Sequence, residues 1–140
     1  MSNLHELHLP GNRLTGTLPS TIGSLDIHIL RLQSQSIFGE AVEYIDYWPN
    51  LEYINLLNTN ATGTIPASIV ERKKLRALFL GSHVTGTIPS RLSELTNLVD
   101  LWLYGSGIEG SIPSDIDKLT KLGKFRRLFC HLFTLLVQIS

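Results

Sequence analysis

The chain repeats one short pattern along almost its whole length. A leucine or isoleucine is followed by apolar residues three and five positions later, and then by a glycine. The pattern recurs every 23 or 24 residues, and its units begin at Leu4, Ile27, Leu51, Leu75 and Leu98, with a further start at Leu122. Units of this length cannot bury their apolar face alone and form a core only by stacking on neighbours. The sequence therefore predicts a solenoid.

Each unit combines a short strand with a turn. In the fifth unit Leu101 and Leu103 alternate with outward positions, which is typical of a strand with one buried face. Successive units are expected to pair these strands into a parallel sheet. The glycine, here Gly110, permits a tight bend or close approach of the next coil, and Pro113 directs the chain into a turn or short helix on the convex side. The predicted fold class is an α/β solenoid.

The repeats resemble a known family. Residues 7–19 read LHLPGNRLTGTLP and match the plant-type leucine-rich repeat pattern L-x-x-L-x-L-x-x-N-x-L-x-G-x-I-P almost letter for letter. The resemblance spans residues 4–122, and it implies a right-handed coil with a parallel sheet on the concave face and 3-10 or short helical turns on the convex face. It also implies a receptor-like protein, a receptor kinase ectodomain or an enzyme inhibitor. The family's loop asparagine is retained only as Asn12.

The two ends depart from the pattern. Residues 1–122 are predicted to form the solenoid, and residues 123–140 either a degenerate sixth unit or an amphipathic capping helix. The helix is suggested by apolar residues at helical spacing, namely Phe125, Phe129, Leu132, Phe133, Leu136 and Ile139. A membrane-surface helix and a gene-model artefact are the alternatives. The apolar stretch 128–139 is shorter than the roughly 20 residues of a membrane-spanning helix. The first coil has no cover, so its edge is expected to self-associate or to continue into further repeats.

Charge and cysteine content narrow the function classes. Twelve basic and twelve acidic residues give a formal net charge of zero, so nucleic acid is not an expected partner. The single cysteine, Cys130, cannot form an internal disulfide. No charged leader precedes Leu4, so no secretion signal is visible, whereas the family resemblance favours an extracellular or cell-surface location. Asn60-Ala61-Thr62 is an N-glycosylation acceptor pattern that agrees with that location. Localisation stays undetermined.

Outward-facing strand positions predict a binding surface. If the strands align, the positions two, four and six residues after each unit start form three columns on the concave face. Four aromatic residues meet there, and Trp and Tyr side chains are enriched among binding hot spots. We therefore predict a site for a protein, peptide or glycan that consists of Tyr53, Asn55, Phe79, Trp102, Tyr104, Arg31 and His8. The alternative interpretation is that the rings pack on one another or face a missing part.

A second surface pattern is a column of threonine pairs. These pairs are Thr15-Gly16-Thr17, Thr62-Gly63-Thr64 and Thr85-Gly86-Thr87. Flat Thr-x-Thr arrays resemble the ice-binding faces of some solenoid proteins, which makes an ice-binding or surface-ordering protein the second functional hypothesis. Phe38-Gly39-Glu40 interrupts the column, and threonine before the glycine is common in this repeat family. A structural spacer without a ligand is the third hypothesis.

Catalytic and metal-binding patterns are not expected. The five histidines, His5, His8, His28, His83 and His131, are interpreted as lying on different units and offsets, so that no pair shares the geometry of a metal site. Cys130 and His131 are adjacent, and no third residue orients them for nucleophilic catalysis. We therefore expect a non-enzymatic chain with no cofactor and no metal.

Overall fold

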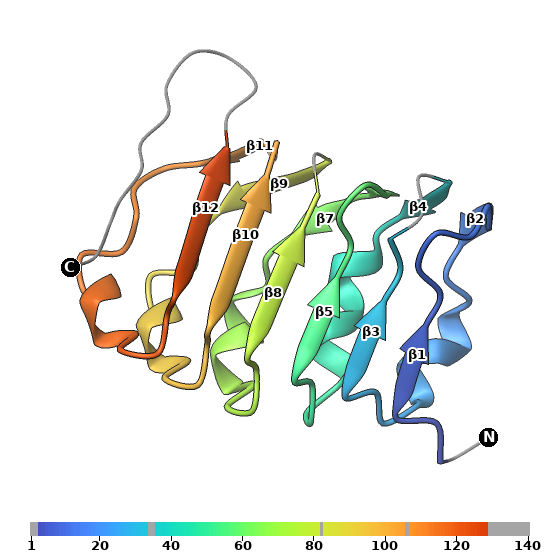
Figure 1. Ribbon diagram of the computed structural model, residues 1–140, viewed down its shortest axis with the longest axis horizontal. Coiled ribbons are helices and arrows are strands. Elements are labelled where there is room, and N and C mark those ends of the chain that lie inside the picture. Colours follow the sequence, from blue (N-terminus) through green and yellow to red (C-terminus); the bar gives the residue numbers. More distant parts are fainter. Residues whose placement is uncertain (1–2, 34–35, 82, 106, 129–140) are drawn as a thin grey trace.

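Six parallel strands form one sheet along the length of the molecule (Figure 1). This computed structural model describes residues 3–33, 36–81, 83–105 and 107–128. Each unit contributes one strand, and the order across the sheet follows the chain: β1 (Glu6–His8), β3 (Ile29–Arg31), β5 (Tyr53–Asn55), β8 (Ala77–Leu80), β10 (Asp100–Tyr104) and β12 (Lys124–Leu128). The predicted solenoid with a parallel sheet is confirmed.

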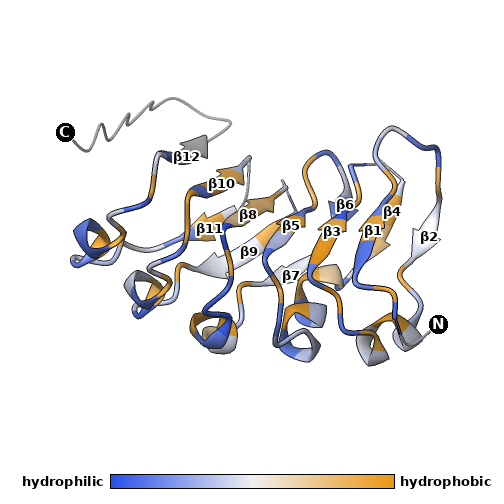
Figure 2. Ribbon diagram, turned by 60° about the horizontal axis from the view of Figure 1, so that its bottom comes forward, coloured by the Kyte–Doolittle hydropathy of each residue, from blue (hydrophilic) through white to orange (hydrophobic). Residues whose placement is uncertain are grey.

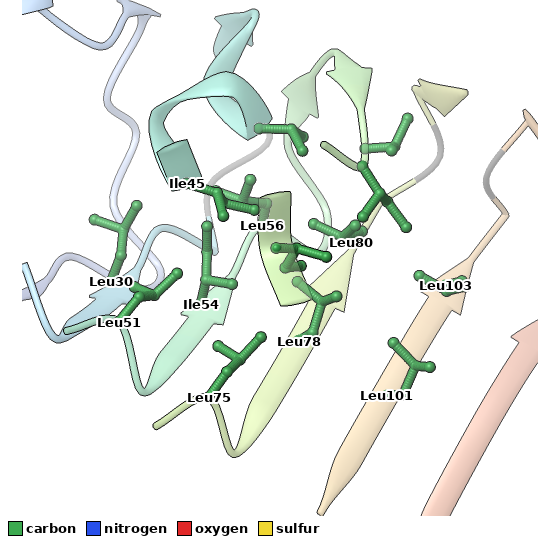
Figure 3. Packing of buried hydrophobic residues seen from close by; sticks show 14 of the residues in the cluster. Leu30, Ile45, Leu51, Ile54, Leu56, Leu75, Leu78, Leu80, Leu101 and Leu103 are labelled. Atoms are coloured by element: carbon green, nitrogen blue, oxygen red, sulfur yellow. The ribbon is translucent and has the colours of Figure 1, made fainter. Parts of the chain in front are cut away.

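The register of the sheet aligns the apolar positions of neighbouring coils. Leu7 pairs with Leu30, and the same row continues through Ile54, Leu78 and Leu101. The last four of these side chains are fully buried, and they lie in successive coils of one interior (Figure 3). Because each coil covers the leucines of the next, the core is shared along the whole stack rather than contained in any single unit.

A second row of short strands runs along the side of the coils. One sheet contains β2 (Gly16–Thr17), β4 (Ile37–Gly39) and β6 (Asn60–Ala61), and another contains β7 (Gly63–Thr64), β9 (Val84–Thr87) and β11 (Gly107–Glu109). Gly86 has a φ of +89°, and a Cβ atom at this position would lie 3.1 Å from Cγ2 of Thr64. The recurring glycine is therefore needed both for its backbone conformation and for the close approach of the previous coil.

Short 3-10 helices line the opposite side of the molecule, as Figure 2 shows. They are η1 (Ser20–Ser24), η2 (Ala41–Tyr47), η3 (Ala67–Glu71), η4 (Leu92–Glu94) and η5 (Ile116–Lys118). Pro19 and Pro66 are the N-cap residues of η1 and η3 and hold the chain extended before the turn. The second unit has Val42 instead of a proline at this position of the repeat, and it forms the longer η2. The fully buried Trp48 follows η2, and its Nε1 donates a hydrogen bond to the carbonyl oxygen of Ile22, 3.2 Å away, in the previous coil.

The chain after Leu122 continues the sheet. The amides of Gly123 and Lys124 donate hydrogen bonds to the carbonyl oxygen of Val99 at 2.9 and 3.3 Å, and β12 pairs with β10 in parallel. The helical interpretation is therefore wrong for residues 124–128, because the edge of β10 offers backbone partners that a strand satisfies. Phe125 packs against the core at the position of a repeat leucine. The capping-helix prediction for residues 129–140, which include Cys130 and His131, lies outside the described residues.

The first coil exposes part of its interior. A hollow of about 520 Å³ beside β1 is lined by apolar side chains that include Leu7, Leu9 and Leu14. Self-association or further repeats at this edge stay predictions. In the described part of the chain, no helix has the length and apolar character to cross a bilayer.

Candidate functional site

The strand register places the predicted site residues on one face of the main sheet. Arg31 of β3 pairs with Asn55 of β5, Asn55 with Phe79 of β8, and Phe79 with Trp102 of β10. Tyr53 lies two residues before Asn55 on the same face, because side chains alternate along a strand. These five residues come from four coils, so their proximity depends on the stacking of the repeats.

Four of these side chains form a continuous stack, which we call the aromatic ladder: Arg31, Tyr53, Phe79 and Trp102. The guanidinium carbon of Arg31 lies 4.4 Å from the centroid of the Tyr53 ring. The Tyr53 and Phe79 centroids are 5.4 Å apart, and the Phe79 and Trp102 centroids are 5.3 Å apart with the planes at 72°. Both ring separations and the edge-on contact are favourable aromatic geometries, and the Arg31 contact is a cation–π interaction. The ladder fixes the position of every ring in it.

This stacking changes the exposure of the predicted site. Phe79 is only 9% exposed, because Tyr53 and Trp102 contact it from both sides. Asn55 is 3% exposed, and its Oδ1 accepts a hydrogen bond from the amide of Leu57 at 3.0 Å. Phe79 and Asn55 therefore lie beneath the exposed surface and hold its side chains in place. Tyr53 and Trp102 are partly exposed, and Tyr104 at the end of β10 is 50% exposed.

The ladder has a polar end. The Nε atom of Arg31 is buried and has no hydrogen-bond partner among the described residues. His8 lies beside Arg31 on β1, where its Nε2 is 3.5 Å from Oε2 of the exposed Glu6. A ligand cannot reach the buried Nε atom, and only the partly exposed remainder of the Arg31 side chain presents its positive charge to the surface. Arg31 is therefore suited to bind a carboxylate or another acceptor next to the rings.

A hollow adjoins the ladder at the start of the strands. It measures about 260 Å³, and its lining includes Tyr53, Glu52, Arg76 and Asp100. Sequence reasoning considered only the strand positions and missed Glu52 and Arg76, which stand immediately before β5 and β8. The hollow adds charges of both signs beside Tyr53.

The helical side has its own aromatic surface. A groove of about 720 Å³ between η1 and η2 is lined in part by Phe38, Tyr44 and Tyr47. Tyr47 is 62% exposed. The periodic pattern did not predict this groove, because η2 replaces the usual proline turn and carries both tyrosines.

The structure corrects the interpretation of the histidines. His5 and His28 both stand one residue after the start of their units, and their ring centroids lie 4.7 Å apart on adjacent coils. Asp26 completes this His5–Asp26–His28 cluster, with its Oδ2 3.1 Å from Nε2 of His28. Hydrogen bonds from Asn50 and His28 hold the pKa of Asp26 below its ordinary value. The interpretation that the histidines occupy different positions of the repeat is therefore wrong for His5 and His28.

The remaining sequence motifs are distributed over the side strands. Asn60 of the glycosylation pattern is exposed at the start of β6. The register pairs Thr64 with Thr85 rather than with Thr87, so successive threonine pairs are offset along the coil. Thr59 replaces the family asparagine, and its Oγ1 donates to the carbonyl oxygen of Leu56 at 2.7 Å.

Comparison with known proteins identifies the repeat. Residues 3–25 match the family model described as Leucine Rich Repeat. A receptor protein kinase-like protein of Arabidopsis thaliana is 29% identical over 101 residues, which are 66% of this chain and 13% of that protein. The plant peptide hormone receptor RGFR1, solved in complex with RGF2, superposes with a TM-score of 0.75 and 31% identity over 86% of this chain and 20% of the receptor chain.

A third similar protein is a plant ice-binding protein, with a TM-score of 0.65 and 29% identity over 73% of this chain and 34% of that chain. The chain thus spans a small part of the receptors that it matches. The resemblance inferred from the repeats is confirmed: the chain is a leucine-rich repeat solenoid, similar in sequence and fold to plant receptor ectodomains.

Proposed function

We propose that the chain is a non-catalytic recognition module that binds a peptide, or an extended segment of a protein, on the outer face of its six-stranded sheet. The observation that carries the proposal is the aromatic ladder, which presents partly exposed rings beside the partly exposed, positively charged Arg31. The similarity to a receptor described as a plant peptide hormone receptor supports a peptide over a glycan.

The ladder suits an extended peptide because it runs across the strands. Tyr53, Trp102 and Tyr104 offer apolar area on side chains that are already ordered, so little conformational entropy is lost on binding. Arg31 lies at one end of this row and favours an acidic side chain or a terminal carboxylate. The expected ligand therefore combines an aromatic or aliphatic residue with a carboxylate at one end.

The test is a selection of random 12-residue peptides displayed on phage against the full chain. Bound peptides are then measured against Trp102→Ala, Arg31→Gln and Tyr47→Ala. Truncation of a hot-spot residue costs about 2 kcal/mol or more, so Trp102→Ala is expected to weaken binding at least about 30-fold. Arg31→Gln is expected to weaken only peptides that carry a carboxylate.

Tyr47→Ala is the matched control, because Tyr47 is an exposed aromatic residue on the helical side. It is expected to leave the affinity unchanged. If selected peptides bind the Trp102 and Arg31 variants as tightly as the parent and lose affinity for Tyr47→Ala, the binding surface is the helical groove and the proposal is wrong. If no peptide is enriched, the structural-spacer hypothesis takes its place.

A second candidate function is ice binding through the threonine pairs. The similarity to a plant ice-binding protein favours it, whereas the offset of Thr64 and Thr87 and the interruption at Phe38 count against a flat array. A thermal-hysteresis measurement decides between the two functions. Hysteresis that is abolished by Thr85→Lys would establish the threonine surface as the active one.

A further inference from the structure

The His5–Asp26–His28 cluster lies at the start of β1 and β3, on residues that the binding surface does not use. Backbone hydrogen bonds hold the two histidines side by side: the amides of His28 and Ile29 both donate to the carbonyl oxygen of His5, at 2.7 and 3.1 Å. The spacing of the two rings is therefore set by the sheet and not by the side chains alone. Asp26, immediately before the second unit, projects its carboxylate between them.

The three residues offer ligand atoms of the kinds that zinc prefers. Oδ2 of Asp26 lies 3.1 Å from Nε2 of His28, and the centroids of the His5 and His28 rings are 4.7 Å apart. One ligand atom from each residue can be chosen so that all three lie within 4.8 Å of one another. Ligands at about 2.0–2.2 Å from a tetrahedral ion are roughly 3.3 Å apart, so side-chain rotations close the remaining distance.

Neighbouring groups already orient the ligands. Nδ2 of Asn50 donates to Oδ1 of Asp26 at 3.0 Å and leaves Oδ2 facing the rings. Nδ1 of His5 is 2.8 Å from the carbonyl oxygen of Asp26, which allows this ring to donate there and to use its other nitrogen as a ligand. Such outer hydrogen bonds to carboxylates and imidazoles are typical of metal sites.

We propose that His5, Asp26 and His28 bind a divalent transition-metal ion, zinc in the first place, that bridges the first and second coils. Two neutral imidazoles and one carboxylate supply three ligands and one negative charge, and the partial exposure of all three residues leaves the remaining position to water. The ion would fasten the first strand to the second at the edge of the sheet. An ordinary hydrogen-bonded imidazole–carboxylate cluster is the competing interpretation.

The test is a calorimetric titration of the EDTA-treated full chain with zinc chloride, together with melting curves at increasing zinc concentration. One saturable site is expected. His28→Gln and Asp26→Asn should each lower the zinc affinity by at least about tenfold, and Asn50→Ala should lower it by roughly tenfold through loss of ligand orientation. Far-UV circular dichroism without zinc verifies that each variant is folded.

Two controls separate this site from other zinc ligands. His83→Gln removes an exposed histidine on a distant coil, and Cys130→Ser removes the only thiol. Both should keep the affinity of the parent and the zinc-dependent rise in melting temperature. If the parent shows no saturable binding, or if Cys130→Ser abolishes it while His28→Gln does not, the proposed site is wrong.

Discussion

The shared core makes a specific prediction for Leu78. This side chain is 0% exposed and lies in register with Ile54 and Leu101 of the adjacent coils. Leu78→Ala removes about three carbon groups, and at about 0.8 kcal/mol for each buried group the transfer cost is about 2.4 kcal/mol. Backbone hydrogen bonds hold the strands on both sides of Leu78 in place, so the surrounding residues can move little to fill the cavity that the substitution leaves. We therefore expect a total loss of about 3–5 kcal/mol in the free energy of unfolding.

The assay is urea unfolding followed by circular dichroism at 25 °C. With a slope of about 2 kcal/mol/M, a loss of about 3 kcal/mol shifts the midpoint by about 1.5 M. The matched control is Leu14→Ala, since Leu14 is 41% exposed, and it should cost less than about 1 kcal/mol. Equal midpoint shifts for the two variants would refute the reasoning that stacked coils bury the repeat leucines.

Three further predictions concern the turns, the charges and the second unit. Gly86→Ala should cost about 1–2 kcal/mol in unfolding free energy, which is more than Gly16→Ala should cost. Both glycines have positive φ, but of the two only Gly86 lies so close to a threonine that the new methyl group would crowd it. A hydrogen bond from Ser93 lowers the pKa of Asp115, so Asp115→Asn should reduce the melting temperature at pH 7, and the difference from the parent should disappear as the pH falls below the ordinary pKa of 3.8. Trp48→Phe should cost about 1–3 kcal/mol in urea unfolding, because it removes one of the two hydrogen bonds to the carbonyl oxygen of Ile22, which keeps the amide of Leu25 as its donor, and leaves a cavity at a fully buried site. A cost below about 0.5 kcal/mol for Trp48→Phe would show that the indole hydrogen bond does not stabilise the fold. A difference in melting temperature that stays constant across the pH range would show that the charge of Asp115 does not contribute to stability.

The sequence predicted the sheet and its register because the repeat period ties each strand to its neighbour. The same period predicted which side chains share a face, as the pairing of Arg31 with Asn55 and of Phe79 with Trp102 confirms. The repeat period did not predict how much of each side chain is exposed to solvent. Whether Phe79 lies open or covered depends on its diagonal contact with Tyr53 and its direct cross-strand contact with Trp102, and a column of outward positions carries no information about how closely these rings approach one another.

The errors have identifiable physical causes. Leu122 and Phe125 fit a helix face and also the first two apolar positions of a repeat, so spacing alone cannot distinguish the two structures, whereas the edge of β10 does so for residues 124–128. The signal for the His5–His28 contact was present in the sequence, since both residues occupy the same position of consecutive units. Asp26 carries no such signal, because it lies in the connection between units.

The two tryptophans allow the most direct test of the proposed binding surface. Trp102 lies in the aromatic ladder, whereas Trp48 is buried behind the helical side. In a ¹⁵N NMR titration of the full chain with a selected peptide, the indole signal of Trp102 is expected to shift in a saturable manner while that of Trp48 stays in place. A saturable shift of Trp48 with an unchanged Trp102 signal would contradict the account and assign recognition to the opposite side of the coil.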